Sequence, residues 1–284
     1  MRNEFSITGF WEGEFDEDGL RKWAETLRAQ LPAPEISLGL VFMAPNFFPQ
    51  AKQTLEILRV HAQVPLLVGC SSTALICGDK EYEGASGIAV ALYSLPGAEL
   101  KSFRFTQQQV EEASGPDFWQ VESGVEQKKS NGWLTFIDPF HLDAESWLAS
   151  WNESYKTLPV YGGLASGIFQ DQTTQVYLDG EVFEDGGVAI SVGGDVKLSG
   201  VISQGCTPIG ETWTLTRVEQ NLIRQIANRP AYSVLAETFQ KLPPAEQQKA
   251  RGNLLIGLVV NEYLEDFHRG DFLVRNLIGG DPNS

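Results

Sequence analysis

The length, composition and charge of this chain already limit its function. It has 284 residues, of which 42% are apolar and 20% are charged, a balance typical of a folded protein with one large or two ordinary domains. The formal net charge of −16 disfavours nucleic acid and anionic lipid headgroups, because both would meet like charge. We therefore expect no nucleic-acid partner and no membrane partner.

The sequence also indicates a cellular compartment. No stretch approaches the ~18 consecutive apolar residues of a membrane-spanning helix, and Met1–Glu4 does not begin a signal peptide. These features predict a cytoplasmic protein. The odd set of Cys70, Cys77 and Cys206, with no CxxC pair, favours neither a disulfide framework nor a zinc site.

The first third of the chain alternates helix and strand patterns. Apolar residues at helical spacing predict helices over 20–31 and 49–62. The nearly continuous apolar runs Ile36–Met43 and Pro65–Gly69 predict two buried strands. Strand, helix and strand in this order form a β-α-β unit. The turn after its second strand consists of Gly69, Cys70, Ser71 and Ser72.

The same unit recurs further along the chain. The positions that repeat at an offset of 94 are Pro139 after Pro45, Pro159 after Pro65, Gly163 after Gly69 and Ser166 after Ser72. Downstream, Gly187 follows Gly87 at an offset of 100, as a six-residue insertion in a hairpin would produce. One register aligns a strand, a helix and a glycine turn, which favours internal duplication over chance similarity of generic β-α-β units.

The remaining patterns complete the predicted fold. Residues 173–217, including 197–203, indicate strands and turns; 218–226 and 231–242 indicate helices, and 254–260 and 272–277 indicate strands. We predict an α/β (mixed α+β) fold, in which duplicated strand-helix-strand-hairpin units form mixed sheets flanked by helices. The predicted domains are a helical lead (1–32), a duplicated domain (33–212, with repeats at about 36–110 and 130–205) and a C-terminal part (213–284).

A third Gly-bounded turn, Ser203–Gly210, lies between two strand patterns. Gly205 and Gly210 allow positive φ or close backbone approach, and Pro208 fixes one φ. Such a turn either packs as a tight crossover or binds a ligand. Its place after the two turns of the repeat favours the ligand.

These turns, together with Phe272–Asn276, resemble the FIST domain, an intracellular sensory domain of signal transduction. The resemblance runs from about Leu38 to the end of the chain. Residues 33–212 look like the N-terminal part of that family, and 213–284 look like an incomplete beginning of its C-terminal part. The resemblance implies binding of an amino acid or related small metabolite, no catalysis, and a signalling-output protein that acts in trans.

We therefore expect a small polar or anionic ligand at the Gly/Ser turns. Backbone N–H groups of such turns form anion-binding concavities, and hydroxyls add donors. Arg275 lies in an apolar strand pattern, so its guanidinium needs an internal carboxylate or a ligand carboxylate. The predicted ligand-binding residues are Gly69, Cys70, Ser71, Ser72, Gly163, Ala165, Ser166, Gly205, Cys206, Thr207, Gly210 and Arg275.

Three alternatives remain open. Some FIST proteins bind haem, for which His61 and His141 are the candidate axial ligands; otherwise both are surface or cap histidines. An enzyme could use Cys206 as nucleophile, although an inert cysteine is the simpler interpretation. A protein-interaction scaffold could expose the helix of Trp147 and Trp151, although such spacing is also typical of a core.

Two isolated carboxylates complete the candidate list. Asp138 follows the first strand of the second repeat, and Glu211 follows the third turn. They are isolated carboxylates and do not indicate a catalytic pair, and we expect both to be solvated caps.

Overall fold

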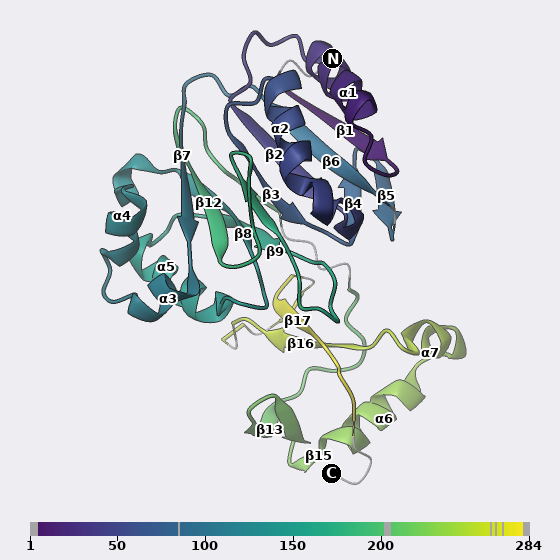
Figure 1. Ribbon diagram of the computed structural model, residues 1–284. Coiled ribbons are helices and arrows are strands. Elements are labelled where there is room, and N and C mark those ends of the chain that lie inside the picture. The colour runs from purple at the N-terminus through teal and green to yellow at the C-terminus, as the bar shows by residue number, and fades with distance from the viewer. Residues whose placement is uncertain are drawn as a thin grey trace. The chain divides into compact units, whose positions relative to one another are not determined.

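The computed structural model describes residues 5–84, 86–201, 206–261, 263–264, 266–268 and 270–280 (Figure 1). The chain divides into two compact units, residues 1–200 and 201–284. In the part that is described, no helix is both long and apolar enough to cross a membrane.

A six-stranded mixed sheet forms one half of the first unit. Helices α1 (Glu17–Gln30) and α2 (Ala51–His61), the latter preceded by the 3-10 helix η1 (Pro45–Gln50), cover its outer face (Figure 1). β2 and β3 run parallel, and the other neighbouring pairs are antiparallel. Across the sheet the strands are β1 (Ser6–Glu12), β6 (Gly87–Tyr93), β2 (Leu38–Met43), β3 (Leu67–Ser71), β10 (Val176–Leu178) and β11 (Glu181–Phe183).

A four-stranded sheet forms the other half. Its order is β7 (Ala98–Phe105), β12 (Gly187–Gly194), β8 (Gly132–Ile137) and β9 (Val160–Leu164). The helical segments of this half are α3 (Gln107–Glu112), α4 (Phe118–Ser123), η2 (Gln127–Lys129) and α5 (Ala144–Ser154). The core between sheet and helices is mainly aromatic, and it includes Phe105, Trp119, Trp133, Trp147, Trp151 and Tyr155.

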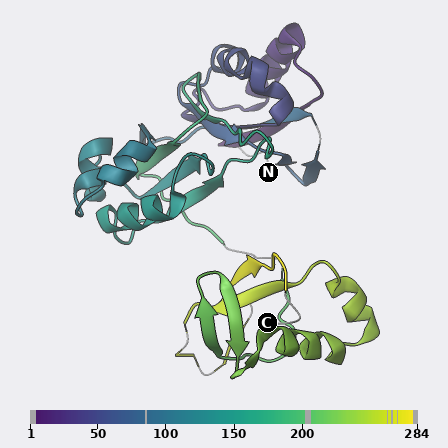
Figure 2. The ribbon, with the colours of Figure 1, turned by 60° about the horizontal axis from the view of Figure 1, so that its bottom comes forward.

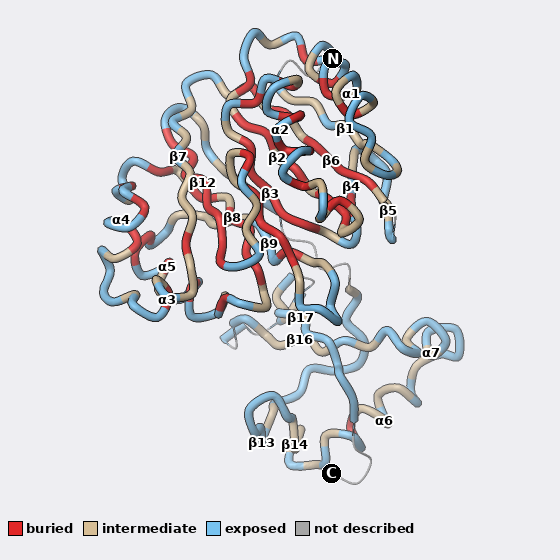
Figure 3. The backbone as a smooth tube through the Cα atoms, viewed as in Figure 1, coloured by how far each residue is buried: buried red, intermediate tan, exposed pale blue. Residues whose placement is uncertain are grey.

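The two sheets pack face to face. In β2, Val41 and Met43 pack toward the helices, whereas Leu38 joins Phe136 of β8 in the apolar layer between the sheets. This alternation is the period of two expected of a strand buried on both faces. Figure 3 shows buried residues along the strands of both sheets. The first unit therefore has four layers (helices, sheet, sheet, helices), which confirms the predicted mixed α/β class.

The two sheets share one topology. The order β1-β6-β2-β3 corresponds to β7-β12-β8-β9, and in each set the last two strands are parallel and the others antiparallel. The predicted repeat contained β2, β3, β8 and β9 with the helices between them, but not β1. Descent by duplication stays a prediction.

The register of the repeat differs from the predicted constant offset. Val41 pairs with Gly69, and Thr135, 94 positions after Val41, pairs with Gly162 rather than Gly163. The offset is therefore 94 between β2 and β8 but 93 between β3 and β9. Because Gly162 and Gly163 are adjacent, either of them could be aligned with Gly69. The predicted alignment with Gly163 was wrong. A one-residue shift in a strand places each side chain on the opposite face.

The hairpins of the two repeats are placed differently. β10 and β11 extend the sheet of the first repeat, because β10 pairs with β3. The hairpin of β4 (Ala74–Cys77) and β5 (Lys80–Glu83) instead forms a separate two-stranded sheet. Its apolar side packs near Phe10, whose ring stacks on Tyr82 at 3.7 Å.

Two segments at the ends of the first unit differ from prediction. β1 was not predicted, since its sequence has glycine and acidic residues; it pairs along its whole length with β6. The expected strand over 197–203 is not formed over Lys197–Val201, and the rest of that range lies outside the described residues.

The second unit begins with a small antiparallel sheet. Figure 2 shows its hairpin of β13 (Leu215–Glu219) and β14 (Leu222–Ile226) beside helix α6 (Ala231–Lys241). The helix predicted over 218–226 was therefore wrong. Gln220, Ala227 and Asn228 have φ of 53°, 49° and 61°, a left-handed backbone typical of tight turns and incompatible with a continuous helix.

The other predictions for this unit agree better. α6 and the short α7 (Pro244–Ala250) are helices, and a two-stranded sheet of β16 (Leu255–Val259) and β17 (Phe272–Asn276) follows. β15 (Arg229–Pro230) completes the first sheet. The apolar run 254–260 would suit a buried strand, but none of its residues is buried in the part of the chain that the structure describes.

Candidate functional site

Two of the predicted Gly/Ser turns meet in the first unit. The predicted turns begin too early, because Gly69, Cys70 and Ser71 are the last residues of β3 and Gly163 lies in β9; the chain turns only after these strands, at their carboxyl ends in the two different sheets. The backbone N–H of Ser166 donates to the carbonyl of Ser71 at 3.0 Å, and the Thr73 N–H donates to Ser166 Oγ at 2.9 Å. The two hydroxyl oxygens of Thr73 and Ser166 lie 3.3 Å apart. Hydrogen bonds therefore join the two turns, although Thr73 and Ser166 are 93 positions apart.

The backbone amides of these turns already have acceptors. Ser71 N–H donates to Gln175 O at 2.8 Å, Ser72 N–H to Met43 O at 2.9 Å, and Ala165 N–H to Ile137 O at 2.8 Å. An anion-binding concavity requires N–H groups that point at the ligand. In this conformation a ligand would therefore meet side chains before backbone amides.

Packing explains two of the glycines in strands β3 and β9 and also explains Cys70. A Cβ at Gly69 would overlap Val41 O, and one at Gly162 would overlap Thr135 O, so both positions require glycine. Gly163 is exposed, and a Cβ there would meet nothing within 4 Å. Cys70 is buried between the sheets, and burial raises the pKa of its thiol to about 12, so this thiol is protonated and inert at neutral pH.

A fully buried carboxylate lies beside the turns. Asp138 follows β8 and is 0% exposed. Its Oδ1 accepts from Phe140 N–H at 3.1 Å and from the Thr174 hydroxyl at 2.7 Å, and its Oδ2 accepts from His141 N–H at 2.8 Å. The expectation of a solvated cap was wrong. Three donors at the turn and on a neighbouring segment compensate the lost hydration.

His141 is held by this carboxylate. Its Nδ1 lies 2.8 Å from Asp138 Oδ2, and its side chain is 52% exposed. Because the carboxylate accepts, Nδ1 is the donor of this hydrogen bond, and Nε2 points away from Asp138. The pair thus presents one oriented imidazole at the carboxyl end of β8.

An apolar rim adjoins these polar groups. Ile168 and Thr173 form an isolated bridge that closes the loop between them. Phe169 in that loop is 77% exposed, and its ring lies 6.0 Å from that of Phe140 in an edge contact. Small-molecule sites often combine a few oriented polar groups with apolar walls. We name the following residues the carboxyl-end cluster: Ser71, Thr73, Asp138, Phe140, His141, Ser166, Phe169 and Thr174.

Sequence reasoning missed several members of this cluster. Thr73 and Thr174 have no motif that marks them, and Asp138 was interpreted as a surface group. The signal available was positional, since Asp138 and His141 directly follow the end of a predicted strand. Ligand sites of α/β sheets gather outside the carboxyl ends of strands.

The remaining predicted residues belong to the second unit or are not described. Gly205 lies outside the described residues. Cys206 is partly buried and Thr207 is exposed, while a Cβ at Gly210 would lie 2.6 Å from Thr238 of α6. Arg275 is exposed on β17, and its guanidinium donates to Val274 O at 3.0 Å. Because Arg275 is exposed, its guanidinium does not require the internal carboxylate that its apolar strand pattern suggested.

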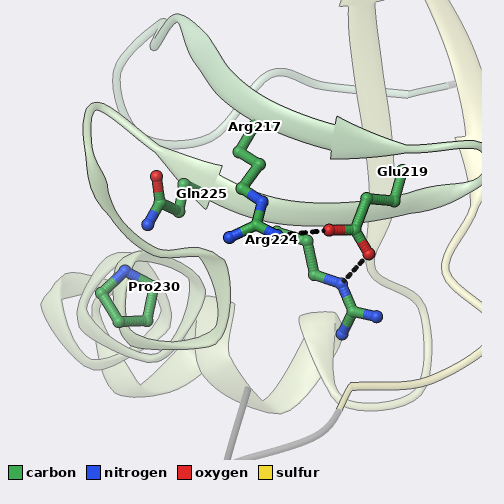
Figure 4. Close-up of a pocket in the computed structure, with 5 residues that line it drawn as sticks. All are labelled: Arg217, Glu219, Arg224, Gln225 and Pro230. Atoms are coloured by element: carbon green, nitrogen blue, oxygen red, sulfur yellow. Dashed lines mark hydrogen bonds and ion pairs between the residues drawn. The ribbon is translucent and has the colours of Figure 1, made fainter.

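Neither His61 nor the residues that line the two cavities belong to the carboxyl-end cluster. His61 ends α2 and contacts Glu25 at 2.8 Å. A cavity of about 220 Å³ in the first unit is lined by Phe5, Pro32, Ala33, Pro34, Ser94 and Pro96. The second unit contains a hollow of about 330 Å³ at its first hairpin (Figure 4). Within the described coordinates, no three His, Cys, Asp or Glu side chains are grouped to bind a metal ion.

Comparison with known proteins identifies one family. The FIST N domain matches residues 37–229. The chain is 28% identical over 260 residues to Uncharacterized protein Rv0628c of Mycobacterium tuberculosis, covering 92% of this chain and 65% of that protein. It is 27% identical over 264 residues to Uncharacterized protein Mb0898c of Mycobacterium bovis, covering 90% and 65%. The chain thus spans 65% of the length of these relatives.

Proposed function

This chain belongs to the FIST N domain family, and on that premise we propose that its first unit binds a small ligand for signal transduction at the carboxyl-end cluster. FIST domains are sensory domains of signal transduction. The ligand of this chain is an amino acid or a related small metabolite. The chain acts by binding, without catalysis, and passes its signal to another protein in the cytoplasm.

The observation that carries this proposal is the meeting of the two Gly/Ser turns. They follow strands of different sheets, and Ser166 bonds both to Ser71 and to Thr73, which lie 95 and 93 positions earlier. Carboxyl ends of strands are where α/β folds place ligands. A ligand held here would contact both sheets, so its binding could be transmitted through either.

The cluster has chemistry suited to a zwitterion. The Asp138 carboxylate contacts His141 Nδ1, and this acidic pair suits a ligand ammonium group. The hydroxyls of Thr73 and Ser166 offer donors for a carboxylate. Phe140 and Phe169 supply an apolar surface for a side chain.

A melting experiment tests this assignment. The 284-residue chain is heated with each of the twenty amino acids, and a ligand raises the melting temperature by mass action. We expect Ser166→Ala and His141→Ala to reduce that rise, while Thr26→Ala, which removes a hydroxyl bonded to Lys22 O on α1, leaves it unchanged. A ligand whose shift is equal in all variants would refute the placement, and no shift with any of the twenty would refute binding of an amino acid.

The burial of two tryptophans argues against the scaffold alternative. Trp147 is 2% exposed and Trp151 is 0% exposed, so the helix α5 presents its tryptophans to the core and not to a partner. A pull-down from a metabolite extract, followed by mass spectrometry, separates the two functions. Enrichment of an amino acid supports the sensor, and retention of protein partners alone supports the scaffold.

A further inference from the structure

The acidity of the chain is confined to one unit. Residues 1–200 contain 13 basic and 28 acidic side chains, a net charge of −15, whereas residues 201–284 contain 8 and 9, a net charge of −1. Within the second unit, the segment 213–230 has three arginines and one glutamate. This segment is locally basic in an acidic protein.

Two of these arginines share a single carboxylate. Arg217 Nη2 lies 2.7 Å from Glu219 Oε1, and Arg224 Nε lies 3.0 Å from Glu219 Oε2. Figure 4 shows both side chains reaching the two oxygens of Glu219 from β13 and β14. These bonds lower the pKa of Glu219, with the hydrogen bond from Arg224 as the largest cause. The glutamate is thus ionised at neutral pH, and the trio has a net charge of +1.

The shared bonds use few of the available donors. A guanidinium carries five N–H donors and no acceptor, and each arginine contacts Glu219 through one nitrogen. The side chains of Arg217 and Arg224 are 60% and 38% exposed. Their other N–H groups can therefore reach a further acceptor without displacing Glu219.

The arginines also line a concave surface. The hollow of about 330 Å³ is bounded by Arg217, Glu219, Arg224, Gln225 and Pro230. Figure 4 shows Gln225 and Pro230 beside Arg217, on the side away from Glu219. Planar guanidinium groups bind carboxylate and phosphate oxygens in bidentate fashion. We propose that this hollow is a binding site for a small molecule with an oxyanion, a carboxylate or a phosphate, held by Arg217 and Arg224.

This site is separate from the carboxyl-end cluster and does not depend on the proposed function. The negative charge of Glu219 offsets part of the positive charge that the two arginines present to an anion. Removing the charge of Glu219 should therefore strengthen anion binding, whereas a purely structural ion-pair network would give no gain in affinity. The two interpretations therefore predict different effects of removing the Glu219 charge on the affinity for an anion.

The experiment is calorimetric titration of the full chain with sodium phosphate and, in a second arm, with sodium acetate, both at constant ionic strength in chloride. We expect saturable binding of at least one anion, and the tighter one identifies the ligand chemistry. Arg224→Gln and Arg217→Gln should each weaken it by about fivefold or more, and Glu219→Gln should tighten it by about threefold. Circular dichroism of each variant confirms that it is folded.

The matched control is Arg229→Gln. Arg229 is an arginine of the same sheet, but it is paired with Glu237 at 2.9 Å and does not line the hollow. Its substitution should leave both affinities unchanged. Absence of saturable binding of both anions, an equal loss with Arg229→Gln, or no gain with Glu219→Gln would each overturn the proposal.

Discussion

The two sheets of the first unit have the same strand order and directions but different chemistry. The helix-side core of the six-stranded sheet is mainly aliphatic, whereas that of the four-stranded sheet is built from stacked and edge-on aromatic rings. Where β2 is followed by Ala44, β8 is followed by Asp138; their N–H groups make equivalent bonds to Gly87 O and Gly186 O. One backbone plan therefore accommodates two cores, and a buried charge appears in only one of these two positions.

The largest effect should come from the aromatic core. Trp151 is 0% exposed and contacts the rings of Trp119, Trp133, Trp147 and Tyr155. Trp151→Ala should lower the free energy of unfolding by about 4 kcal/mol, because it removes the ring and leaves a cavity. Leu58→Ala on the aliphatic side should cost about 3 kcal/mol. Urea unfolding measures both, and a larger loss at Leu58 would reverse this comparison.

The next effect tests the register of the two repeats. Gly162→Ala should cost about 3 kcal/mol, because its Cβ would overlap Thr135 O at a φ of 146°. Gly163→Ala should change stability by less than about 0.5 kcal/mol, because a Cβ there meets nothing within 4 Å. Equal melting temperatures of the two variants would restore the alignment of Gly163 with Gly69.

A smaller effect tests the buried charge. Asp138→Ala should cost about 2 kcal/mol, because the buried Thr174 hydroxyl and neighbouring donors lose their acceptor. The reciprocal change, Ala44→Asp, should also destabilise, since it places a carboxylate beside Leu75 and Ala89. Thermal unfolding measures both variants. A stable Ala44→Asp protein would show that the two positions are interchangeable.

The smallest effect is a pH dependence. Burial raises the pKa of both Cys70 and Tyr155 to about 12, with the Tyr155 shift partly offset by the hydrogen bond of Ser123. Because the folded pKa values exceed the unfolded ones, the stability they contribute is complete below about pH 9 and is lost as pH rises toward 12. Linkage gives a loss of about 1 kcal/mol by pH 10 from Cys70 alone.

The control for this dependence is Cys70→Ala, which should flatten the alkaline loss measured by urea unfolding between pH 8 and pH 10. Tyr155 remains as a second, weaker contribution in the other half of the unit. An unchanged pH profile in the variant would contradict the role of the buried thiol.

Local pattern predicted much of the first unit. The apolar runs of β2 and β3 and the helical spacing of α2 were sufficient, because strands buried on both faces and amphipathic helices leave strong periodic signals. The hairpin in the second unit failed for a specific reason. Val218, Leu222 and Ile226 recur every four residues, a helical spacing that two short strands and a tight turn reproduce by coincidence.

The candidate site was predicted only in outline. Ser71, Ser72 and Ser166 were selected as turn residues, and the structure brings Ser71 and Ser166 into contact. The burial of Asp138 could not be inferred, because one of its donors, Thr174, lies 36 positions away and reaches it only through the fold. That the turn amides are already bonded is likewise a property of packing and not of sequence.

The placement of the β10–β11 hairpin determines how the chain reaches its folded state. β10 closes the outer edge of β3 by pairing Val176 with Cys70, more than 100 positions earlier. During synthesis, the outer edge of β3 therefore stays unpaired until β10 has been made. Such an edge is a template for association with other chains. We therefore expect the two repeats to fold together, and a chain truncated between them to be prone to aggregate.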